Sequence, residues 1–416
     1  METTDAARSP LGPLTAWGVT RLVLLLFVLR VLVLPGPDVT SDVSVIYRDW
    51  YDVLRTGTFP LDDVTWQYPP AAAFAILSPG LLPFWDYPTA FFALACAADL
   101  TVLALLLRAG RGPGRSRAGA RVWVAGVPLL GPTVYARYDV MVTAVAVGAL
   151  LAAGRHPRAA GALAALGALL KVWPALVLAG LRGRGTWAAA ALTGAGLAAL
   201  FAVTMPGAFA FLTFQRERGT EVESLGSLVL HVARHFGWDG RVLLNYGSVE
   251  FLGPHVGTVS TVSLALTATA FGWLLLWRLA ASRFAAHTAA DAALTAVLLF
   301  TVTSRVISPQ YLVWLVGLAG VCGCFRASRM RVPAALVLAA SAVTVLEFPV
   351  WFAHVVASDP LGIALLSVRN GLLVAAALVA ARALWRGAVP RGGPGRSAAF
   401  RRLSRAPSAD TPATAP

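Results

Sequence analysis

Charged side chains are scarce in this 416-residue chain: they make up 13% of it, whereas 57% of the residues are hydrophobic. Soluble domains carry about 25% charged residues, so this chain has too little polar surface to cover a globule in water. The composition excludes a soluble enzyme, a disordered chain and a nucleic-acid-binding module, although the net charge is +14. Because a bilayer crossing needs about 20 apolar residues, we expect an all-α polytopic membrane protein with about ten to twelve transmembrane helices.

Cysteine and the common cofactor motifs are also scarce or missing. The three cysteines lie inside apolar runs and form no CxxC pair, so we expect neither a disulfide framework nor a zinc site. The chain has no P-loop, no GxGxxG after a strand, no HExxH and no GxSxG, which leaves a nucleotide-fed enzyme without support. We therefore expect no metal and no cofactor.

Lysine occurs once, as Lys171, in a chain that has 33 arginines. Lys171 interrupts an apolar run in the tetrapeptide KVWP. A charge in such a place faces a polar cavity or a protein partner, and the alternative is a lysine that snorkels to the membrane interface. We interpret Lys171 as a cation for a phosphate group.

The distribution of arginine predicts the topology, because cytoplasmic loops are rich in basic residues. Residues 108–121 contain five arginines and no acid, whereas residues 36–68 contain six aspartates and two arginines. The first segment is expected inside and the second outside. The same rule gives ten full crossings, with both termini cytoplasmic. Because both ends of residues 159–181 are basic, the rule predicts that this segment enters and leaves the membrane on the cytoplasmic side. It forms a hairpin broken at Lys171, or two further spans that bring the number of crossings to twelve.

We expect one transmembrane domain over residues 1–381, with a first outer loop at 36–85 and a long outer loop at about 207–258. Residues 382–416 contain seven arginines and one acid, which predicts a disordered basic tail on the cytoplasmic side. Most polar clusters other than the arginine-rich loops are predicted on the outer side of the membrane. This predicts a plasma-membrane protein whose active site faces away from the cytoplasm.

The acids of the first outer loop are candidates for a general base, which takes the proton from an acceptor hydroxyl. Asp38 and Asp42 directly follow the first membrane helix, where a lipid-borne substrate would meet them. Plain solvation is the alternative for each acid of this loop. The next outer turn contains Arg137 and Asp139, for which an ion pair with each other is the simplest expectation.

A third outer segment, TSRVISPQY at 303–311, places Arg305 between two spans. Arginine offers a bidentate fork to phosphate, and Ser308, Gln310 and Tyr311 supply hydroxyl and amide groups beside it. Capping of the adjoining helix ends is the alternative for these residues.

Five polar residues lie inside predicted spans, where they should face the protein interior because they are costly in lipid: Asp99, Asp291, Glu347, Arg369 and Asn370. They could form an ion path, so the alternative function is a secondary transporter or a lipid or glycan flippase. Five such groups in about ten spans are few for a coupled transporter. The acids of the long outer loop are expected on a solvated helix face: Glu217, Glu221 and Glu223.

Several short motifs occur in a characteristic order along residues 17–382. They are Asp42 with Tyr47, Gly57 and Pro60 before YPP at 68–70, a turn that ends in Asp139, a run that ends in LLKVWP, and SPQYLVW from Ser308 to Trp314. With these motifs the chain resembles glycosyltransferase family 87, of the membrane-embedded class C superfamily. The order of YPP, KVWP and SPQYLVW is the most specific part of the resemblance.

The resemblance implies transfer of a sugar, mannose in related enzymes, from a polyprenyl-phosphate donor to a hydroxyl of a glycolipid or glycan, with inversion. It implies Asp42 as the catalytic base, with Asp38 as the alternative, while Lys171 and Arg305 are expected to hold the donor phosphate. The implied partners are the donor, the acceptor and the lipid bilayer, with no nucleic acid. Substrate contacts are expected from Tyr47, Tyr68, Asp139, Ser308, Gln310 and Tyr311.

Overall fold

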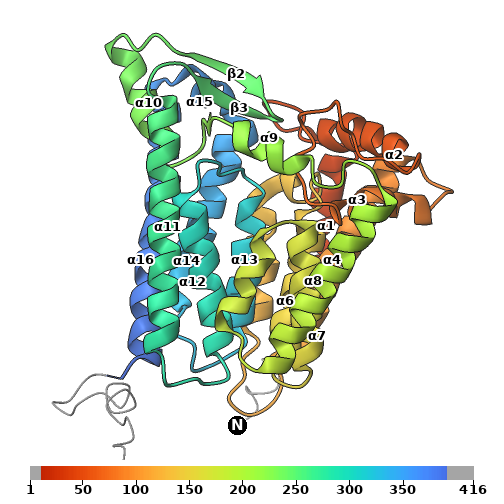
Figure 1. Cartoon of the computed structure of the whole chain (residues 1–416), viewed down its shortest axis with the longest axis vertical. Coiled ribbons are helices and arrows are strands. Elements are labelled where there is room, and N and C mark those ends of the chain that lie inside the picture. Colours follow the sequence, from red (N-terminus) through yellow and green to blue (C-terminus); the bar gives the residue numbers. More distant parts are fainter. Residues whose placement is uncertain (1–10, 391–416) are drawn as a thin grey trace, which may run out of the picture.

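The computed structural model describes residues 11–390 and forms a bundle of long helices with a small sheet and short helices at one end (Figure 1). The predicted all-α, multi-pass membrane fold is confirmed. Six described helices are long and apolar enough to cross a membrane, or seven if one bent pair, Pro128–Val134 with Asp139–Ala152, counts as a span. The six are α1 (Leu11–Val28), α4 (Tyr87–Ala109), α8 (Arg184–Thr204), α11 (Val256–Ala280), α14 (Arg331–Val345, extended by a π-helical turn to Val350) and α16 (Pro360–Ala388).

The predicted number of crossings stays a prediction, because three apolar helices are too short to span about 30 Å alone. These are α7 (Pro157–Leu170), α12 (Thr288–Thr303) and α13 (Tyr311–Gly323). Helix α16 continues to Ala388, so the predicted tail is helical at its start and not disordered from residue 382. The rest of that tail, residues 391–416, lies outside the described residues.

The remaining helices are short and lie between the long ones: α2 (Arg48–Leu54), α3 (Ala72–Leu77), α5 (Ala118–Gly126), α6 (Asp139–Ala152), α9 (Phe211–Glu217), α10 (Ser227–Ala233) and α15 (Phe352–Ala357). A π-helical turn covers Asp42–Tyr47, and 3-10 turns cover Ser78–Leu81, Pro128–Val134, Trp173–Gly180 and Arg234–Phe236. The strands are β1 (Thr220–Glu221), β2 (Arg241–Asn245) and β3 (Ser248–Leu252), in the antiparallel order β1-β3-β2. This small sheet was not expected from the sequence.

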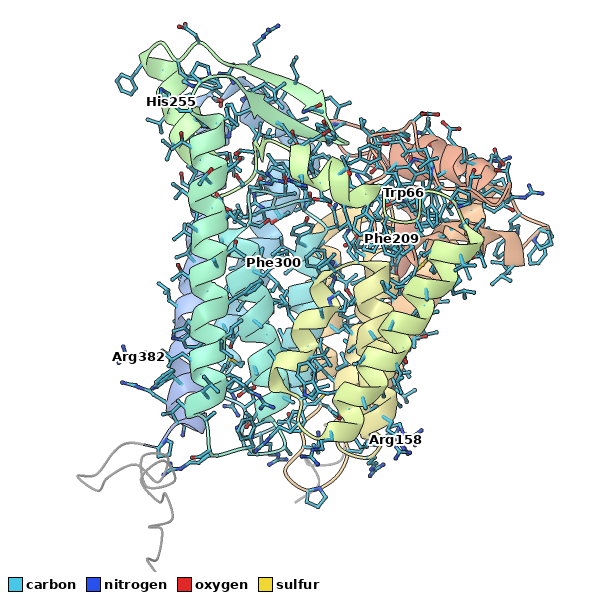
Figure 2. The ribbon with its side chains drawn as sticks, viewed as in Figure 1. Trp66, Arg158, Phe209, His255, Phe300 and Arg382 are labelled. Atoms are coloured by element: carbon cyan, nitrogen blue, oxygen red, sulfur yellow. The ribbon has the colours of Figure 1, made fainter. Side chains whose placement is uncertain are left out.

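We call residues 207–255, which hold α9, α10 and the sheet, the cap. The cap lies at the same end of the bundle as α2 and α15 (Figure 1). Figure 2 shows Trp66 and His255 toward this capped end, and Arg158 and Arg382 toward the opposite end. The polar outer-loop segments and the arginine-rich loops are thus separated along the long axis of the bundle.

Helix α13 is the centre of the bundle, since nearly every residue from Leu312 to Cys322 is buried. Small residues let its neighbours approach closely, as expected for membrane helices. At Gly161, for example, an added Cβ would lie 2.0 Å from the carbonyl oxygen of Thr186, so glycine permits the contact between α7 and α8. Helix α13, which carries Tyr311 and Trp314, packs closely on α6, where an added Cβ at Gly317 would lie 2.4 Å from Cγ2 of Thr143.

The helical run that contains Lys171 is interrupted where the sequence predicts. Helix α7 ends at Leu170, Lys171 is extended with φ −160° and ψ 132°, and a 3-10 turn begins at Trp173. Pro174 lacks a backbone N–H and cannot continue the helical ladder. The interruption turns Lys171 out of the helix and into the protein interior.

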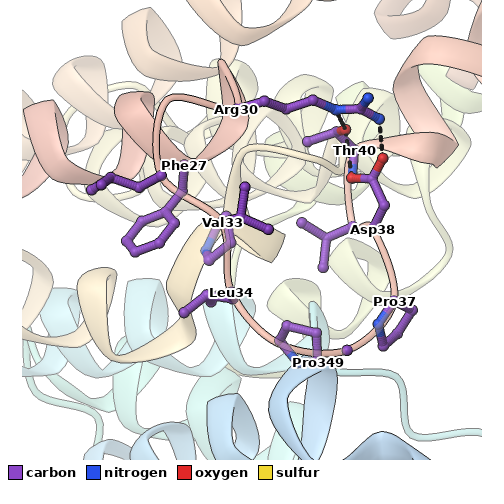
Figure 3. Close-up of a pocket in the computed structure, with 12 residues that line it drawn as sticks. Phe27, Arg30, Val33, Leu34, Pro37, Asp38, Thr40 and Pro349 are labelled. Atoms are coloured by element: carbon purple, nitrogen blue, oxygen red, sulfur yellow. Dashed lines mark hydrogen bonds and ion pairs between the residues drawn. The ribbon is translucent and has the colours of Figure 1, made fainter.

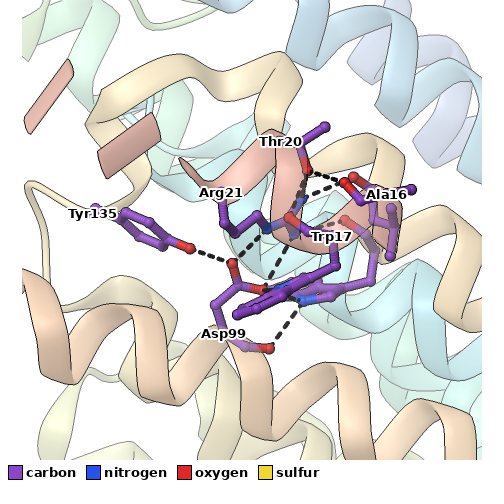
Figure 4. A network of polar contacts seen from close by, with 8 residues as sticks. Ala16, Trp17, Thr20, Arg21, Asp99 and Tyr135 are labelled. Atoms are coloured by element: carbon purple, nitrogen blue, oxygen red, sulfur yellow. Dashed lines mark hydrogen bonds and ion pairs between the residues drawn. The ribbon is translucent and has the colours of Figure 1, made fainter. Parts of the chain in front are cut away.

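Asp99 joins the first helix to the rest of the bundle (Figure 4). Its carboxylate is fully buried and accepts hydrogen bonds from Arg21 Nε at 2.7 Å, Trp123 Nε1 at 2.6 Å, Tyr135 Oη at 2.6 Å and Trp17 Nε1 at 3.1 Å. These bonds tie α1, α4 and α5 to the turn that contains Tyr135. Asp99 is therefore a structural anchor.

The other polar residues predicted inside the spans are buried too, with at most 4% of each residue exposed. Asp291 accepts a hydrogen bond from Ser328, and Glu347 pairs with Arg369 at 2.8 Å. The prediction that these residues face the protein interior is confirmed. Asp291 and Glu347 thus each have a protein partner within the bundle.

We expect Arg21→Met to lower the free energy of unfolding by about 3–5 kcal/mol, because it leaves the buried Asp99 without its counter-charge. Arg48→Met is the matched control, since Arg48 and Asp52 are about half exposed and such pairs contribute about 0–1 kcal/mol. Thermal unfolding of the two purified variants in detergent measures the difference. An unchanged unfolding temperature for Arg21→Met would contradict the anchoring role of Asp99.

His231 fastens the cap to the bundle. Its Nε2 donates to the carbonyl oxygen of Val222 at 2.7 Å, so its Nδ1 accepts from the hydroxyl of Ser358 at 2.6 Å. Burial lowers the pKa of His231 to about 4, which keeps the ring neutral near pH 7. Arg234 adds a bond to the carbonyl oxygen of Val356 at 2.7 Å. The cap is thus held at a fixed place above the helices.

Candidate active site

Three ion pairs surround Tyr68 at the capped end of the bundle. The Lys171 ammonium lies 5.3 Å from the centre of the Tyr68 ring, and charges from all three pairs act on this residue. Burial, followed by the carboxylates of Asp139 and Asp42, raises the pKa of Tyr68, so its phenol is neutral. The pairs are Asp42–Arg137 at 2.8 Å, Asp139–Lys171 at 2.7 Å and Glu250–Arg218 at 3.1 Å.

The first pair joins the start of the π-helical turn to the turn before α6. Arg137 binds Asp42 and also donates to the carbonyl oxygen of Val39 at 3.1 Å. The predicted pair between Arg137 and Asp139 is therefore wrong. Asp139 is the first residue of α6 and is already bound by Lys171, which leaves Arg137 free to reach across to Asp42.

Asp42 is the accessible acid of the three pairs. Its side chain is 28% exposed, whereas the side chains of Asp139 and Glu250 are 1% and 0% exposed. A general base has to come within hydrogen-bond distance of the proton that it takes. Of these three acids, Asp42 is the one that an incoming hydroxyl can reach.

The second pair is enclosed by aromatic rings. Lys171 Nζ donates to both carboxylate oxygens of Asp139, at 2.7 and 2.9 Å, and Trp314 Nε1 donates to the same carboxylate at 2.6 Å. Four aromatic rings lie within cation–π distance of Nζ, and the side chain of Lys171 is 11% exposed. Lys171 therefore does not snorkel, and that alternative is wrong. The rings lie 5.2–5.7 Å from Nζ and belong to Tyr68, Tyr138, Tyr311 and Trp314.

The third pair belongs to the cap and was not predicted from the sequence. Arg218 follows α9, and Glu250 lies on β3. Glu250 also accepts a hydrogen bond from the backbone N–H of Gly219 at 2.9 Å, while Arg218 donates to the hydroxyl of Ser248 at 2.5 Å. The pairing of β1 with β3, with Glu221 opposite Glu250, brings these residues together, and this register cannot be read from either segment alone.

Glu221 and Glu223 are 2% and 4% exposed, so the predicted solvated face is wrong for both. Glu221 lies between the sheet and the SPQY segment, whereas the backbone carbonyl of Glu223 accepts from Arg369 of α16 at 2.6 Å. Glu221 accepts a hydrogen bond from Ser308 at 3.0 Å, and burial raises the pKa of Glu221 despite the nearby Arg218. Glu217, in contrast, is exposed as predicted.

The SPQY segment joins the cap to the aromatic cage around Lys171. Tyr311 stacks on Trp314 with ring centres 3.9 Å apart, and Gln310 is half-buried at the start of α13. The carbonyl oxygen of Arg305 accepts from the backbone N–H of Glu221 at 3.0 Å, and its guanidinium binds the carbonyl oxygen of Gln215. Arg305 therefore lies beside the cap, with its guanidinium bound to backbone.

Tyr47 lies next to the first two ion pairs. Its ring is buried against Trp50 at 5.4 Å and Tyr138 at 6.0 Å. Among residues 11–390, no side chain or backbone group hydrogen-bonds its hydroxyl. A buried hydroxyl without a hydrogen-bond partner is unusual.

Asp38 lies apart from the three pairs, in a pocket of about 250 Å³ between the end of α1 and two prolines, Pro132 and Pro349 (Figure 3). It accepts hydrogen bonds from the backbone N–H and hydroxyl of Thr40, at 2.9 and 2.7 Å, and pairs with Arg30. Burial opposes its ionisation, but the bonds from Thr40 and the charge of Arg30 outweigh this and hold the pKa of Asp38 below its usual value.

Most of the residues predicted for the site thus gather in one cluster. Asp42, Tyr47, Tyr68, Asp139 and Lys171 line its centre, with Ser308 and Tyr311 on the side of the cap. Arg305 and Gln310 lie at its edge, and Asp38 lies outside it. The cluster has cations that can hold a phosphate. Within residues 11–390, no group of three or more His, Cys, Asp or Glu residues is placed to hold a metal ion.

A multi-pass helical membrane protein with an accessible carboxylate and several cations at one end has the organisation of a membrane-embedded glycosyltransferase. The chain matches the profile of glycosyltransferase family 87 over residues 66–309, which is more than half of its length. It therefore belongs to glycosyltransferase family 87 and is a membrane glycosyltransferase. No curated protein sequence matches the chain.

Proposed function

We propose that the protein transfers a sugar from a polyprenyl-phosphate donor to an acceptor hydroxyl, with Asp42 as the base and Lys171 as a ligand of the donor phosphate. The observation that carries the proposal is the placement of the Asp42–Arg137 and Asp139–Lys171 pairs near Tyr68, whose ring centre lies 5.3 Å from the Lys171 ammonium. A base and a phosphate ligand must lie on either side of one anomeric carbon, and this cluster supplies both.

In the proposed reaction, Asp42 takes the proton of the acceptor hydroxyl as the hydroxyl oxygen forms a bond to the anomeric carbon. The bond from that carbon to the phosphate oxygen breaks, and its electron pair leaves with the polyprenyl phosphate. Attack from the face opposite the phosphate inverts the configuration at the anomeric carbon. Arg137 holds the Asp42 carboxylate in place through the ion pair at 2.8 Å.

Lys171 meets the charge that develops on the leaving phosphate. A preorganised cation placed where charge develops stabilises a transition state without rearrangement. Asp139 accepts two bonds from this ammonium, Trp314 donates to the same carboxylate, and four aromatic rings lie around Lys171 Nζ. The neutral hydroxyls of Tyr47 and Tyr68 are suited to hydrogen bonds with the sugar. The resemblance to mannosyltransferases supports mannose as the sugar.

The charge distribution supports an orientation in which the capped end faces away from the cytoplasm, as the positive-inside rule requires. We expect Asp62→Cys to react with a membrane-impermeant thiol reagent in intact cells, and Arg111→Cys not to react. Both residues are exposed, and the proposed orientation puts residue 62 outside the cell and residue 111 inside it. Wild type is the background control, since Cys322 and Cys324 are buried and Cys96 is half-buried. Reaction at residue 111 in intact cells would reverse the proposed orientation.

Purified protein in lipid nanodiscs, incubated with radiolabelled polyprenyl-phosphate-mannose and an extract of membrane lipids and glycans, tests the function. We expect label in an acceptor, and none when the donor is a nucleotide-linked mannose. Transfer from the nucleotide sugar, or no transfer from the polyprenyl-phosphate donor, would contradict the proposal.

A further inference from the structure

We propose that Arg218, which the cap carries, is a second ligand of the donor phosphate, and that Arg305 acts as a positioning residue for it. The inference rests on the proposed function, because it concerns the same donor. It changes the expected role of Arg305, which the sequence suggested as a phosphate ligand.

Arg218 and Lys171 both lie near the rings of Tyr68 and Tyr311. The charge of Arg218 acts on Tyr68, on Tyr311 and on Lys171. Both rings also face Lys171, with ring centres 5.3 and 5.7 Å from its ammonium. A phosphodiester has two non-bridging oxygens, and two cations placed in this way can each meet one of them.

Exposure and anchoring make Arg218 suitable for this role. Its side chain is 9% exposed, close to the 11% of Lys171 and of Arg137, whereas Glu250 beneath it is fully buried. Glu250 and Ser248 accept bonds from two of its nitrogen atoms, and a guanidinium has five N–H donors in all. Arg218 is therefore a fixed cation at the surface of the cluster, with donors left for a ligand.

The guanidinium of Arg305 has a different task. It binds the carbonyl oxygen of Gln215, and the side-chain amide of Gln215 donates to the carbonyl oxygen of Gln67 at 2.9 Å. This chain of bonds fastens the end of α9 to the residue before Tyr68. Since Arg218 directly follows α9, Arg305 sets the place from which Arg218 reaches the phosphate.

Binding of polyprenyl monophosphate to the purified full chain in nanodiscs tests the role of Arg218. We expect about tenfold to a hundredfold weaker binding for Arg218→Gln, the loss of a charge-assisted contact. Arg216→Gln is the matched control, because Arg216 lies two residues away and is exposed, and its affinity should equal that of wild type. Equal affinities for Arg218→Gln and wild type would overturn the inference.

The outcomes separate this inference from the proposed function. If Lys171→Ala weakens binding and Arg218→Gln does not, the role of Arg218 is wrong while the proposed function stands. If wild type binds polyprenyl phosphate no better than the uncharged polyprenol, the proposed function itself fails. Should Arg218→Gln fail to fold, a cryo-EM structure of wild type with polyprenyl phosphate decides. The Arg218 guanidinium must then lie within hydrogen-bond distance of the phosphate, and a larger separation overturns the role.

A double-mutant cycle tests the positioning role of Arg305. Residues that act through one another give non-additive effects. We expect Arg305→Gln to weaken binding in the wild-type background and to add little in the Arg218→Gln background. If the two losses add, Arg305 contributes independently of Arg218, and the positioning role is wrong.

Discussion

Asp42→Asn is expected to lower the rate of sugar transfer by about 10²–10⁴-fold, the usual contribution of a general base, while the protein still folds and binds the donor. Asparagine has the shape of aspartate but cannot accept the proton of the acceptor hydroxyl. Transfer rates from a polyprenyl-phosphate sugar, measured at matched protein concentration and saturating donor, provide the test.

Asp38→Asn is the control for this variant, because Asp38 lies in the same loop but is bound to Thr40 and Arg30 in a separate pocket. Its transfer rate should stay within a few-fold of wild type. An active Asp42→Asn together with an inactive Asp38→Asn would move the base to the pocket at the end of α1. Full activity of both variants would remove this loop from the chemistry.

Lys171→Ala is expected to weaken donor binding and lower turnover, each by about tenfold to a hundredfold, because a charge-assisted bond contributes roughly 1.5–3 kcal/mol and 1.4 kcal/mol is a factor of ten. Lys171→Arg should be impaired too, since the planar guanidinium is larger than an ammonium and four rings enclose the site. Binding of a polyprenyl-phosphate sugar and initial rates measure both effects.

The loss of Lys171 also leaves Asp139 charged and buried, which could unfold the protein instead of emptying the site. The double variant Lys171→Met with Asp139→Asn separates these effects. It removes both charges, so we expect it to unfold closer to the wild-type temperature than Lys171→Ala does, and still to bind the donor weakly. Restored donor affinity in the double variant would show that Lys171 is only a structural partner of Asp139.

The sequence alone predicted the helical membrane fold and several of the segments that meet at the candidate site. Composition was sufficient for the first, and the order of YPP, KVWP and SPQY for the second. The interruption at Lys171 was also predictable, because Pro174 cannot continue a helix. These features depend on local chemistry, which a single segment carries.

The pairing of charges was not predictable in the same way. Arg137 binds Asp42 and not its near neighbour Asp139, because the start of α6 turns Asp139 toward Lys171. The contact between Arg218 and Glu250 depends on the register of a sheet that joins residues about 30 positions apart. Tertiary packing decides which acid and which base form an ion pair, and the sequence motif around either residue does not indicate its partner.

The most direct test of the account is a cryo-EM structure of the Asp42→Asn variant with a polyprenyl-phosphate-mannose donor in nanodiscs. The variant should hold the donor without consuming it. The account predicts the donor phosphate within hydrogen-bond distance of Lys171 Nζ, and the anomeric carbon between that phosphate and residue 42. A phosphate bound away from Lys171, for example beside Arg30 in the pocket at the end of α1, would contradict it.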